Sequence, residues 1–291
     1  MWDAADRYPI GTLLYATVAP RLYPDEELVA VTTSREAPGD RAAESVTSSA
    51  AEPAAPSSTS YAARRDAAMS PPYRVPDLKS SALRAPAHEP VAIPLTPSEA
   101  TGPGPVLAGR WELLNDLTRS ADGGEAIGER IIVTGRVLTE DGRGLPDTVI
   151  EIWQANAAGR YRTEVDRHDA PLDPNFTGVG RLQTDAAGTY RMLTIRPGAY
   201  PWKNHPNAWR PAHVHFSLFG PSMRSRLVTQ MYFPGDPLLP LDPIFMAVPA
   251  EARGRLLAAY DHSITQEAWA LGFLFDIVLA GPRATPADPV V

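Results

Sequence analysis

The chain has 291 residues, of which 44% are hydrophobic and 21% charged, enough apolar material for a sizeable core. Its net charge of −7 disfavours a nucleic-acid partner, which usually needs a basic face. The absence of cysteine excludes disulfides, thiolate metal sites and a cysteine nucleophile. Any metal must therefore be held by histidine, carboxylate, phenolate or backbone oxygen, and the 31 prolines predict many turns and long loops.

The beginning of the chain differs in composition from the remainder. Residues 34–70 consist mainly of Ala, Ser, Thr, Pro, Glu and Asp, which cannot bury enough apolar surface to offset the entropy of ordering. We predict that residues 1–68 form a largely disordered extension and low-complexity linker, with a translation start at Met69 as an alternative. One domain is expected over 69–291, with an N-terminal arm over about 69–108 and a β-sandwich core over about 109–283.

No targeting signal or membrane segment is expected. The first ten residues carry no basic region ahead of an apolar stretch, so they do not resemble a secretory signal. No apolar run approaches the roughly 20 residues that a membrane-spanning helix needs. These patterns predict a cytoplasmic protein.

Short β-branched runs separated by turn residues predict an all-β protein. The expected strands cover 131–138, 148–155, 189–195, 213–219, 226–233 and 272–280. One helix is expected over 249–260, where good helix formers gather. The predicted fold class is an antiparallel β-sandwich core with long ordered loops and few short helices.

The sharpest local feature is the string Arg-Pro-Ala-His-Val-His-Phe at 210–216. Side chains of a strand alternate between its faces, so His213 and His215 point the same way, as two ligands of one metal must. Two unrelated core or surface histidines can have the same spacing. Four carboxylates and two loop tyrosines could complete such a site: Glu151, Asp166, Asp169, Asp173, Tyr161 and Tyr200. Composition and spacing do not choose among them.

Several longer strings resemble a known family. IEIWQANAAGRYR, APLDPNFTGVGR, RPGAYPWKNHPNAWRPAHVHF and TQMYFPGDPLLP are similar, in this order over about 77–282, to the beta subunits of protocatechuate 3,4-dioxygenases, which are intradiol ring-cleavage dioxygenases. The resemblance implies a β-sandwich that holds one non-haem Fe(III) per chain through two tyrosines and two histidines. Matched by motif, these ligands are Tyr161, Tyr200, His213 and His215.

The resemblance also implies an activity, the cleavage of protocatechuate (3,4-dihydroxybenzoate) with O2 to 3-carboxy-cis,cis-muconate. The catechol would bind the ferric ion through both oxygens and displace Tyr200, while Tyr161 stays bound. Arg210 matches an arginine beside the substrate ring, where a fixed cation can stabilise negative charge. A structural salt bridge is the alternative for this arginine. Three further residues match substrate-binding positions: Trp202, Gln230 and Ile244.

Two features depart from the family pattern. Leu78 aligns with a tyrosine that helps family members to bind the substrate carboxylate, and Tyr73 could take that role if the register slips. The N-terminal extension lies outside the resemblance. The family pairs this subunit with a homologous alpha subunit that lacks iron, so a hetero-oligomer of alpha-beta pairs is implied. Two alternatives stay open: cleavage of catechol or hydroxyquinol instead, and a non-catalytic β-sandwich that binds a metal or another ligand.

Overall fold

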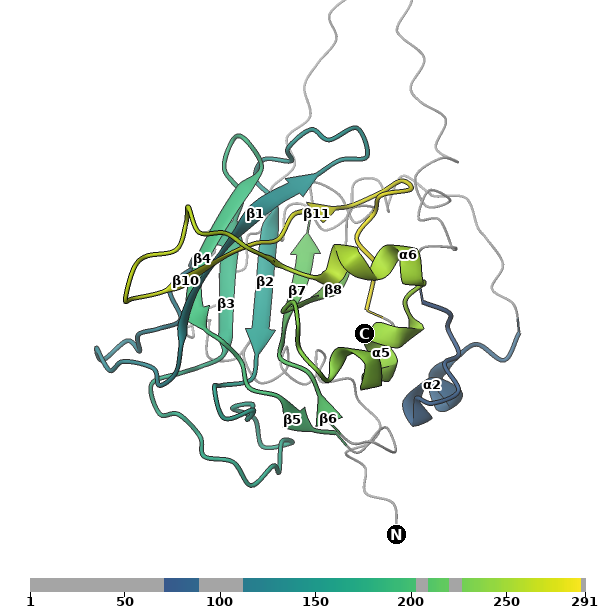
Figure 1. Cartoon of the computed structure of the whole chain (residues 1–291), viewed down its shortest axis with the longest axis horizontal. Coiled ribbons are helices and arrows are strands. Elements are labelled where there is room, and N and C mark those ends of the chain that lie inside the picture. Colours follow the sequence, from purple (N-terminus) through teal and green to yellow (C-terminus); the bar gives the residue numbers. More distant parts are fainter. Residues whose placement is uncertain (1–70, 89–111, 203–208, 220–226, 289–291) are drawn as a thin grey trace, which may run out of the picture.

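The computed structural model describes residues 71–88, 112–202, 209–219 and 227–288. Two β-sheets pack against each other, and short helices lie to one side of them (Figure 1). The predicted linker at 1–68 and most of the predicted arm lie outside the described residues. Within the described ranges, no helix is long and apolar enough to cross a membrane.

The first sheet is built around β1 (Arg130–Leu138), which pairs antiparallel with β4 (Thr189–Ile195). On its other side β1 pairs parallel with β10 (Leu271–Leu274) and, further along, with β11 (Ile277–Val278). The strand β9 (Ala259–Tyr260) pairs antiparallel with β10. The prediction of a mostly antiparallel all-β fold is confirmed, but this sheet is mixed. Parallel neighbours come from distant parts of the chain, so a local sequence pattern does not reveal them.

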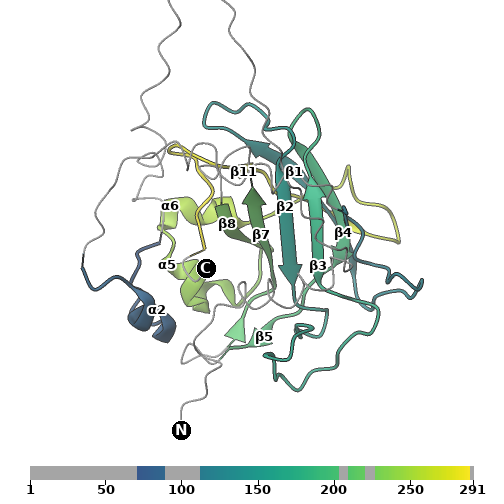
Figure 2. The ribbon, with the colours of Figure 1, turned by 180° about the vertical axis from the view of Figure 1, so that it is seen from behind.

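The second sheet is antiparallel throughout. Its strands follow the order β3 (Val179–Gln183), β2 (Val149–Gln154), β7 (His213–Phe219) and β8 (Leu227–Tyr232). Figure 2 shows this sheet from behind, with β7 and β8 nearest to the helices. The expected strands at 148–155, 213–219 and 226–233 are confirmed to within about a residue at each end, whereas β3 was not expected.

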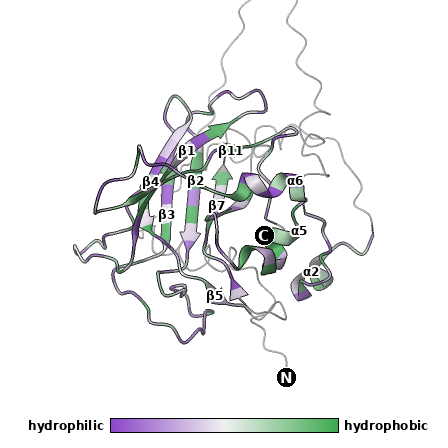
Figure 3. Cartoon of the chain, viewed as in Figure 1, coloured by the Kyte–Doolittle hydropathy of each residue, from purple (hydrophilic) through white to green (hydrophobic). Residues whose placement is uncertain are grey.

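Alternation along β7 decides which face carries the histidines. Val214, Phe216 and Leu218 are fully buried in the main hydrophobic core between the two sheets. Apolar and polar residues accordingly alternate along the strands (Figure 3). His213 and His215 must then point to the opposite face, away from this core. The face outside the sandwich, beside the short helices, is therefore where a site can form.

Two sequence predictions about the C-terminal part are wrong in extent. Instead of one helix over 249–260, the chain forms α6 (Ala250–Arg253) and a 3-10 turn (Gly254–Leu256), and then becomes extended. The extended chain lets Ala258 N donate to Tyr232 O at 2.9 Å beside β8, and this tertiary contact overrides local helix propensity. The long strand expected at 272–280 is divided between β10 and β11.

The break between these two strands has a local cause. The carbonyl of Phe275 accepts a hydrogen bond from Tyr190 Oη at 2.5 Å, and the side chain of Asp276 accepts one from Arg136 N at 2.7 Å. Phe275 N still donates to Thr134 O of β1 at 2.9 Å, but these side-chain contacts interrupt the ladder between β10 and β11. Three short helical elements were also not expected from the sequence: α2 (Lys79–Arg84), α5 (Pro243–Ala247) and the 3-10 turn Leu239–Leu241.

Candidate active site

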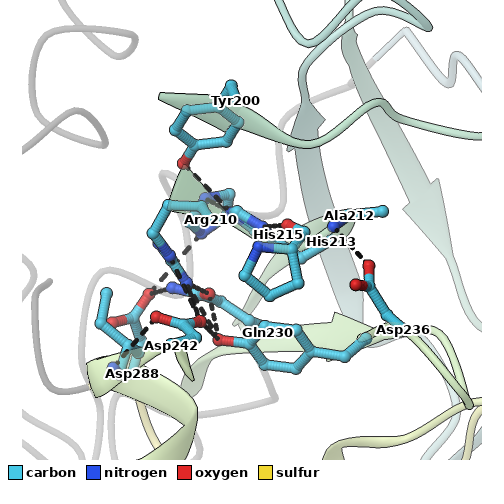
Figure 4. A network of polar contacts seen from close by, with 12 residues as sticks. Tyr200, Arg210, Ala212, His213, His215, Gln230, Asp236, Asp242 and Asp288 are labelled. Atoms are coloured by element: carbon cyan, nitrogen blue, oxygen red, sulfur yellow. Dashed lines mark hydrogen bonds and ion pairs between the residues drawn. The ribbon is translucent and has the colours of Figure 1, made fainter. Parts of the chain in front are cut away.

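His213 and His215 lie together on the outer face of β7, as their spacing predicted. Their Nε2 atoms are 3.2 Å apart (Figure 4), and the two residues are 1% and 6% exposed. Imidazole nitrogens bind transition metals at about 2.0–2.1 Å, so two of them at a right angle stand about 3 Å apart. The observed distance therefore suits two nitrogens that share one cation.

Each imidazole is oriented by its surroundings. His213 Nδ1 donates to the carbonyl of Pro211 at 2.7 Å, which leaves the Nε2 lone pair free to bind a metal. His215 stacks on Trp153, its cross-strand neighbour in β2, with ring centroids 4.6 Å apart and planes 7° from parallel. Burial lowers the pKa of both histidines, most strongly that of His213. Both rings are therefore held in the neutral form that binds metals.

Two tyrosines lie beside the histidine pair. Tyr200 Oη is 3.3 Å from His213 Nε2. The rings of Tyr161 and Tyr200 pack edge to face, with their centroids 5.3 Å apart. The Tyr161 hydroxyl is buried without a hydrogen-bond partner among the described residues. Burial raises the pKa of both phenols. A buried hydroxyl with no partner is costly and therefore needs an explanation, which a cation at this point would provide.

Close glycine packing brings the two tyrosine loops together. Gly159 and Gly198 both donate their backbone N–H to the carbonyl of Asn156, at 3.0 and 2.9 Å. Gly159 has φ +77°, and a Cβ there would lie 2.1 Å from the carbonyl oxygen of Ala199. Only glycine allows this approach. The strings Gly-Arg-Tyr and Gly-Ala-Tyr contain this information, but only the folded chain shows that the two glycines meet.

Replacing Gly159 by alanine is expected to destabilise the protein by about 2–4 kcal/mol, because left-handed strain adds to a backbone clash. Gly142 provides a matched control, since it has φ +84° and a Cβ there would have nothing within 4 Å. Its replacement by alanine should cost only about 1–2 kcal/mol from backbone strain. Urea unfolding of the two variants measures the difference. Equal losses would show that the contact with the Ala199 carbonyl is unimportant.

The carboxylates considered from the sequence are engaged elsewhere or exposed. Glu151 forms an ion pair with Arg181 at 2.8 Å, and Asp166 accepts from the backbone N–H of Tyr161 at 2.8 Å. Asp173 accepts from a backbone N–H at 2.7 Å, and Asp169 is exposed. In the part of the chain that the structure describes, no group of three or more His, Asp or Glu side chains could hold a metal. A cation at the histidine pair would thus draw on the tyrosines.

Arg210 lies directly opposite Tyr200 in the short ladder of β5 (Tyr200–Pro201) and β6 (Trp209–Arg210). Its side chain is only 3% exposed and forms an ion pair with the fully buried Asp242 at 3.1 Å. Its Nη2 also donates to Gln230 Oε1 at 2.6 Å and to Tyr232 Oη at 3.0 Å (Figure 4). The structural salt bridge considered from the sequence is therefore present, and it holds the guanidinium beside the tyrosine and histidine cluster.

The remaining predicted substrate-binding residues lie around this cluster. Gln230 is the cross-strand neighbour of His215. The guanidinium carbon of Arg210 lies over the ring of Trp202, 5.2 Å from the ring centroid. Ile244 packs in one apolar cluster with Leu78, with Trp202 at its edge. Tyr73 is 70% exposed, so it does not take the place of the aromatic side chain that the family has at Leu78.

Several residues of the site were not identified from the sequence. Asp242 precedes a proline and caps α5, with its Oδ1 accepting from Ile244 N at 3.1 Å, so an Asp-Pro helix-start signal was available. Trp153, Tyr232 and Asp288 had no local signal, because only sheet pairing and the fold of the C-terminal segment place them here.

The donor set fits a hard, highly charged cation. Two neutral imidazoles and the Tyr200 phenol lie within hydrogen-bonding distance of one another, and the ring of Tyr161 packs against that of Tyr200. Phenolate is a hard anionic oxygen ligand suited to Fe(III). A ferric ion would supply the positive charge that stabilises two phenolates in a buried place, where burial alone raises their pKa. The residues present therefore fit a non-haem ferric centre.

Comparisons with known proteins agree with this chemistry. A family model described as Dioxygenase matches residues 103–281. The chain is 56% identical over 227 residues to the protocatechuate 3,4-dioxygenase beta chain of Burkholderia cepacia, a match that covers 77% of this chain and 96% of that relative. It is 27% identical to the protocatechuate 3,4-dioxygenase alpha chain of Burkholderia cepacia, over 65% of this chain and 94% of that relative.

A third match covers a shorter stretch of the chain and is to an enzyme named for a different substrate. The chain is 33% identical to catechol 1,2-dioxygenase 2 of Acinetobacter lwoffii, over 40% of this chain and 45% of that relative. The match to the family model covers more than half of the chain, and the beta-chain relative is matched along nearly its whole length. The chain therefore belongs to the intradiol ring-cleavage dioxygenases, a family of enzymes that use non-haem iron.

Proposed function

We propose that the chain is the iron-bearing subunit of an enzyme that cleaves protocatechuate with O2 to 3-carboxy-cis,cis-muconate. Tyr161, Tyr200, His213 and His215 would hold one Fe(III) per chain. The observation that carries this proposal is that His213 Nε2 lies 3.2 Å from His215 Nε2 and 3.3 Å from the Tyr200 hydroxyl, with the buried Tyr161 ring packed against Tyr200. The substrate is suggested by the name of the beta-chain relative at 56% identity.

When bound, the ferric ion would supply Lewis acidity that activates the catechol ring toward O2. The two tyrosines would have different roles. Tyr161 is the fixed donor, since its backbone N–H is held by Asp166 and its loop by the Gly159 contact. Tyr200 would be the second tyrosine donor, and its Oη would accept a proton from a catechol hydroxyl. Arg210 would balance the negative charge on the substrate.

The apolar side chains beside the donors would form the walls for the ring. Trp202 and Ile244 come from different parts of the chain and pack in the same apolar cluster. A flat aromatic substrate gains binding energy from such walls, while the polar groups fix its orientation. Gln230, beside His215, would contribute to that orientation by holding the Arg210 side chain at 2.6 Å.

A visible spectrum and a metal analysis test the proposal directly. Tyrosinate-to-Fe(III) charge transfer should colour the purified protein burgundy-red, with about one iron per chain bound by these ligands. A colourless protein that nevertheless contains iron would contradict tyrosine ligation. That result would favour a β-sandwich that binds a metal without catalysis.

The chain is also proposed to act together with a homologous alpha subunit. Support comes from the two relatives of Burkholderia cepacia, one a beta chain and one an alpha chain, which both match this sequence. Large apolar side chains are exposed on the described surface and could contact such a partner: Ile127, Trp209, Tyr260 and Trp269.

Catechol itself is a second candidate substrate, and Leu78 favours it. Leu78 is 1% exposed and packs against Ile244, so an apolar side chain occupies the position where the family has a tyrosine for the substrate carboxylate. Values of kcat/KM for protocatechuate, catechol and hydroxyquinol, measured with and without the alpha subunit, separate these candidates. We expect protocatechuate to be preferred in the complex. A preference for catechol there would contradict the proposed substrate but leave ring cleavage intact.

A further inference from the structure

Like the Tyr161 hydroxyl, a nitrogen of His215 has no hydrogen-bond partner among the described residues. His215 Nδ1 is buried, and no acceptor lies within hydrogen-bonding distance of it among the described residues. The Oδ2 atom of the Asp288 carboxylate is 3.6 Å from this nitrogen. This separation is longer than a hydrogen bond but within range of a strong electrostatic interaction in a buried place. By contrast, the matching nitrogen of His213 already donates to Pro211 O at 2.7 Å.

Hydrogen bonds to β8 hold the segment that follows β11 and so place the Asp288 carboxylate near His215. Asp288 N donates to Val228 O at 2.8 Å, and Thr229 Oγ1 donates to Pro286 O at 2.7 Å, so the segment lies along β8. The Asp288 side chain is 0% exposed, and its Oδ2 also accepts from Gln230 Nε2. The same oxygen thus faces both Gln230 and His215, which are cross-strand neighbours (Figure 4).

The carboxylate also belongs to the buried charged network of the site. Gln230 accepts from Arg210 through Oε1 and donates to Asp288 through Nε2, and Arg210 pairs with Asp242 at 3.1 Å. A cation bound at His215 would therefore lie near a buried carboxylate, which favours positive charge at that place.

We propose that Asp288 is a positioning residue that orients His215 through Nδ1. This inference rests on the proposed function, because it assumes that His215 binds iron. Histidine ligands of metals almost always donate their second N–H to a carboxylate or carbonyl, which fixes the ring and raises its basicity. Pro211 does this for His213. For His215 the carboxylate placed to take this role is that of Asp288, 3.6 Å from Nδ1.

The test uses the full chain with three variants. Asp288→Asn removes the charge but keeps the size, Asp288→Glu keeps the charge, and Thr229→Val removes only the bond between β8 and Pro286. Iron retention against a chelator, the visible charge-transfer band and the Fe(III)/Fe(II) midpoint potential are measured, with thermal unfolding as a check of the fold. Asp288→Asn should weaken iron binding about 10- to 100-fold and shift the potential to more positive values. Asp288→Glu should recover most of the affinity.

The outcomes separate this inference from the proposed function. If Asp288→Asn binds iron with wild-type affinity, spectrum and potential, the positioning role is wrong while iron ligation stands. If Thr229→Val weakens iron binding as much as Asp288→Asn, the segment acts only by docking and the inference also fails. A wild-type protein that retains no iron would instead overturn the proposed function itself.

Discussion

Replacing His213 by alanine should abolish iron binding and lower ring-cleavage activity by about 10³-fold or more, because the Lewis acid supplies several kcal/mol of transition-state stabilisation. His213 Nε2 lies 3.2 Å from His215 Nε2 and 3.3 Å from Tyr200 Oη, so it is at the centre of the donor set. Iron content, the visible spectrum and steady-state kinetics with the alpha subunit measure the effect. His262→Ala is a suitable control, since that histidine is exposed and should leave all three unchanged.

The two tyrosine variants should differ from each other. Tyr161→Phe is expected to lose iron nearly as severely as His213→Ala, since Tyr161 is the proposed permanent donor. Tyr200→Phe should keep part of the iron and mainly slow the binding of catechol, because Tyr200 is the ligand that the substrate is proposed to replace. Near-wild-type turnover in all of these variants would show that the ligands have been assigned wrongly.

Asp242→Asn is expected to lower the free energy of unfolding by about 3–5 kcal/mol, the usual loss when one partner of a buried ion pair is removed. The guanidinium of Arg210 would remain buried, at 3% exposure, without its carboxylate partner at 3.1 Å. Asparagine keeps an oxygen that can cap α5 through Ile244 N, so the variant isolates the charge. Urea unfolding monitored by tryptophan fluorescence gives the value.

An exposed ion pair provides the comparison for this measurement. Glu129 and Arg196 are 3.3 Å apart, but their side chains are 48% and 40% exposed. Solvent screens such a pair, so Glu129→Gln should change stability by at most about 1 kcal/mol. Similar losses in the two variants would mean that Asp242 does not stabilise Arg210 through its charge.

The strand pattern of the sequence predicted the position of the histidine pair well. The alternation of Val214 and Phe216 with the two histidines required that the imidazoles share the face opposite the core, and the structure confirms it. This inference works because the period of side-chain direction in a strand is local and independent of the remaining fold. The extent of the helix at 249–260 failed for the opposite reason, since pairing of Ala258 with β8 is a long-range contact.

The tyrosine pair illustrates the limit of local patterns. Neither residue stands out by composition or spacing, and it was the resemblance of longer strings that singled out Tyr161 and Tyr200. In the structure their rings meet because Gly159 packs against the Ala199 carbonyl, a contact between loops far apart in the sequence. Arg210 shows the same limit, because its partner Asp242 comes from the cap of a helix that was not expected.

The sequence by itself determined the all-β class, most of the strands and the shared face of His213 and His215, because periodicity and turn chemistry act over a few neighbouring residues. The tertiary structure decided the parallel pairing of β1 with β10, the contact between the Tyr161 and Tyr200 rings, and the position of Asp288 beside His215. These contacts join segments that are distant along the chain. They depend on the packing of the whole fold, which no local pattern encodes.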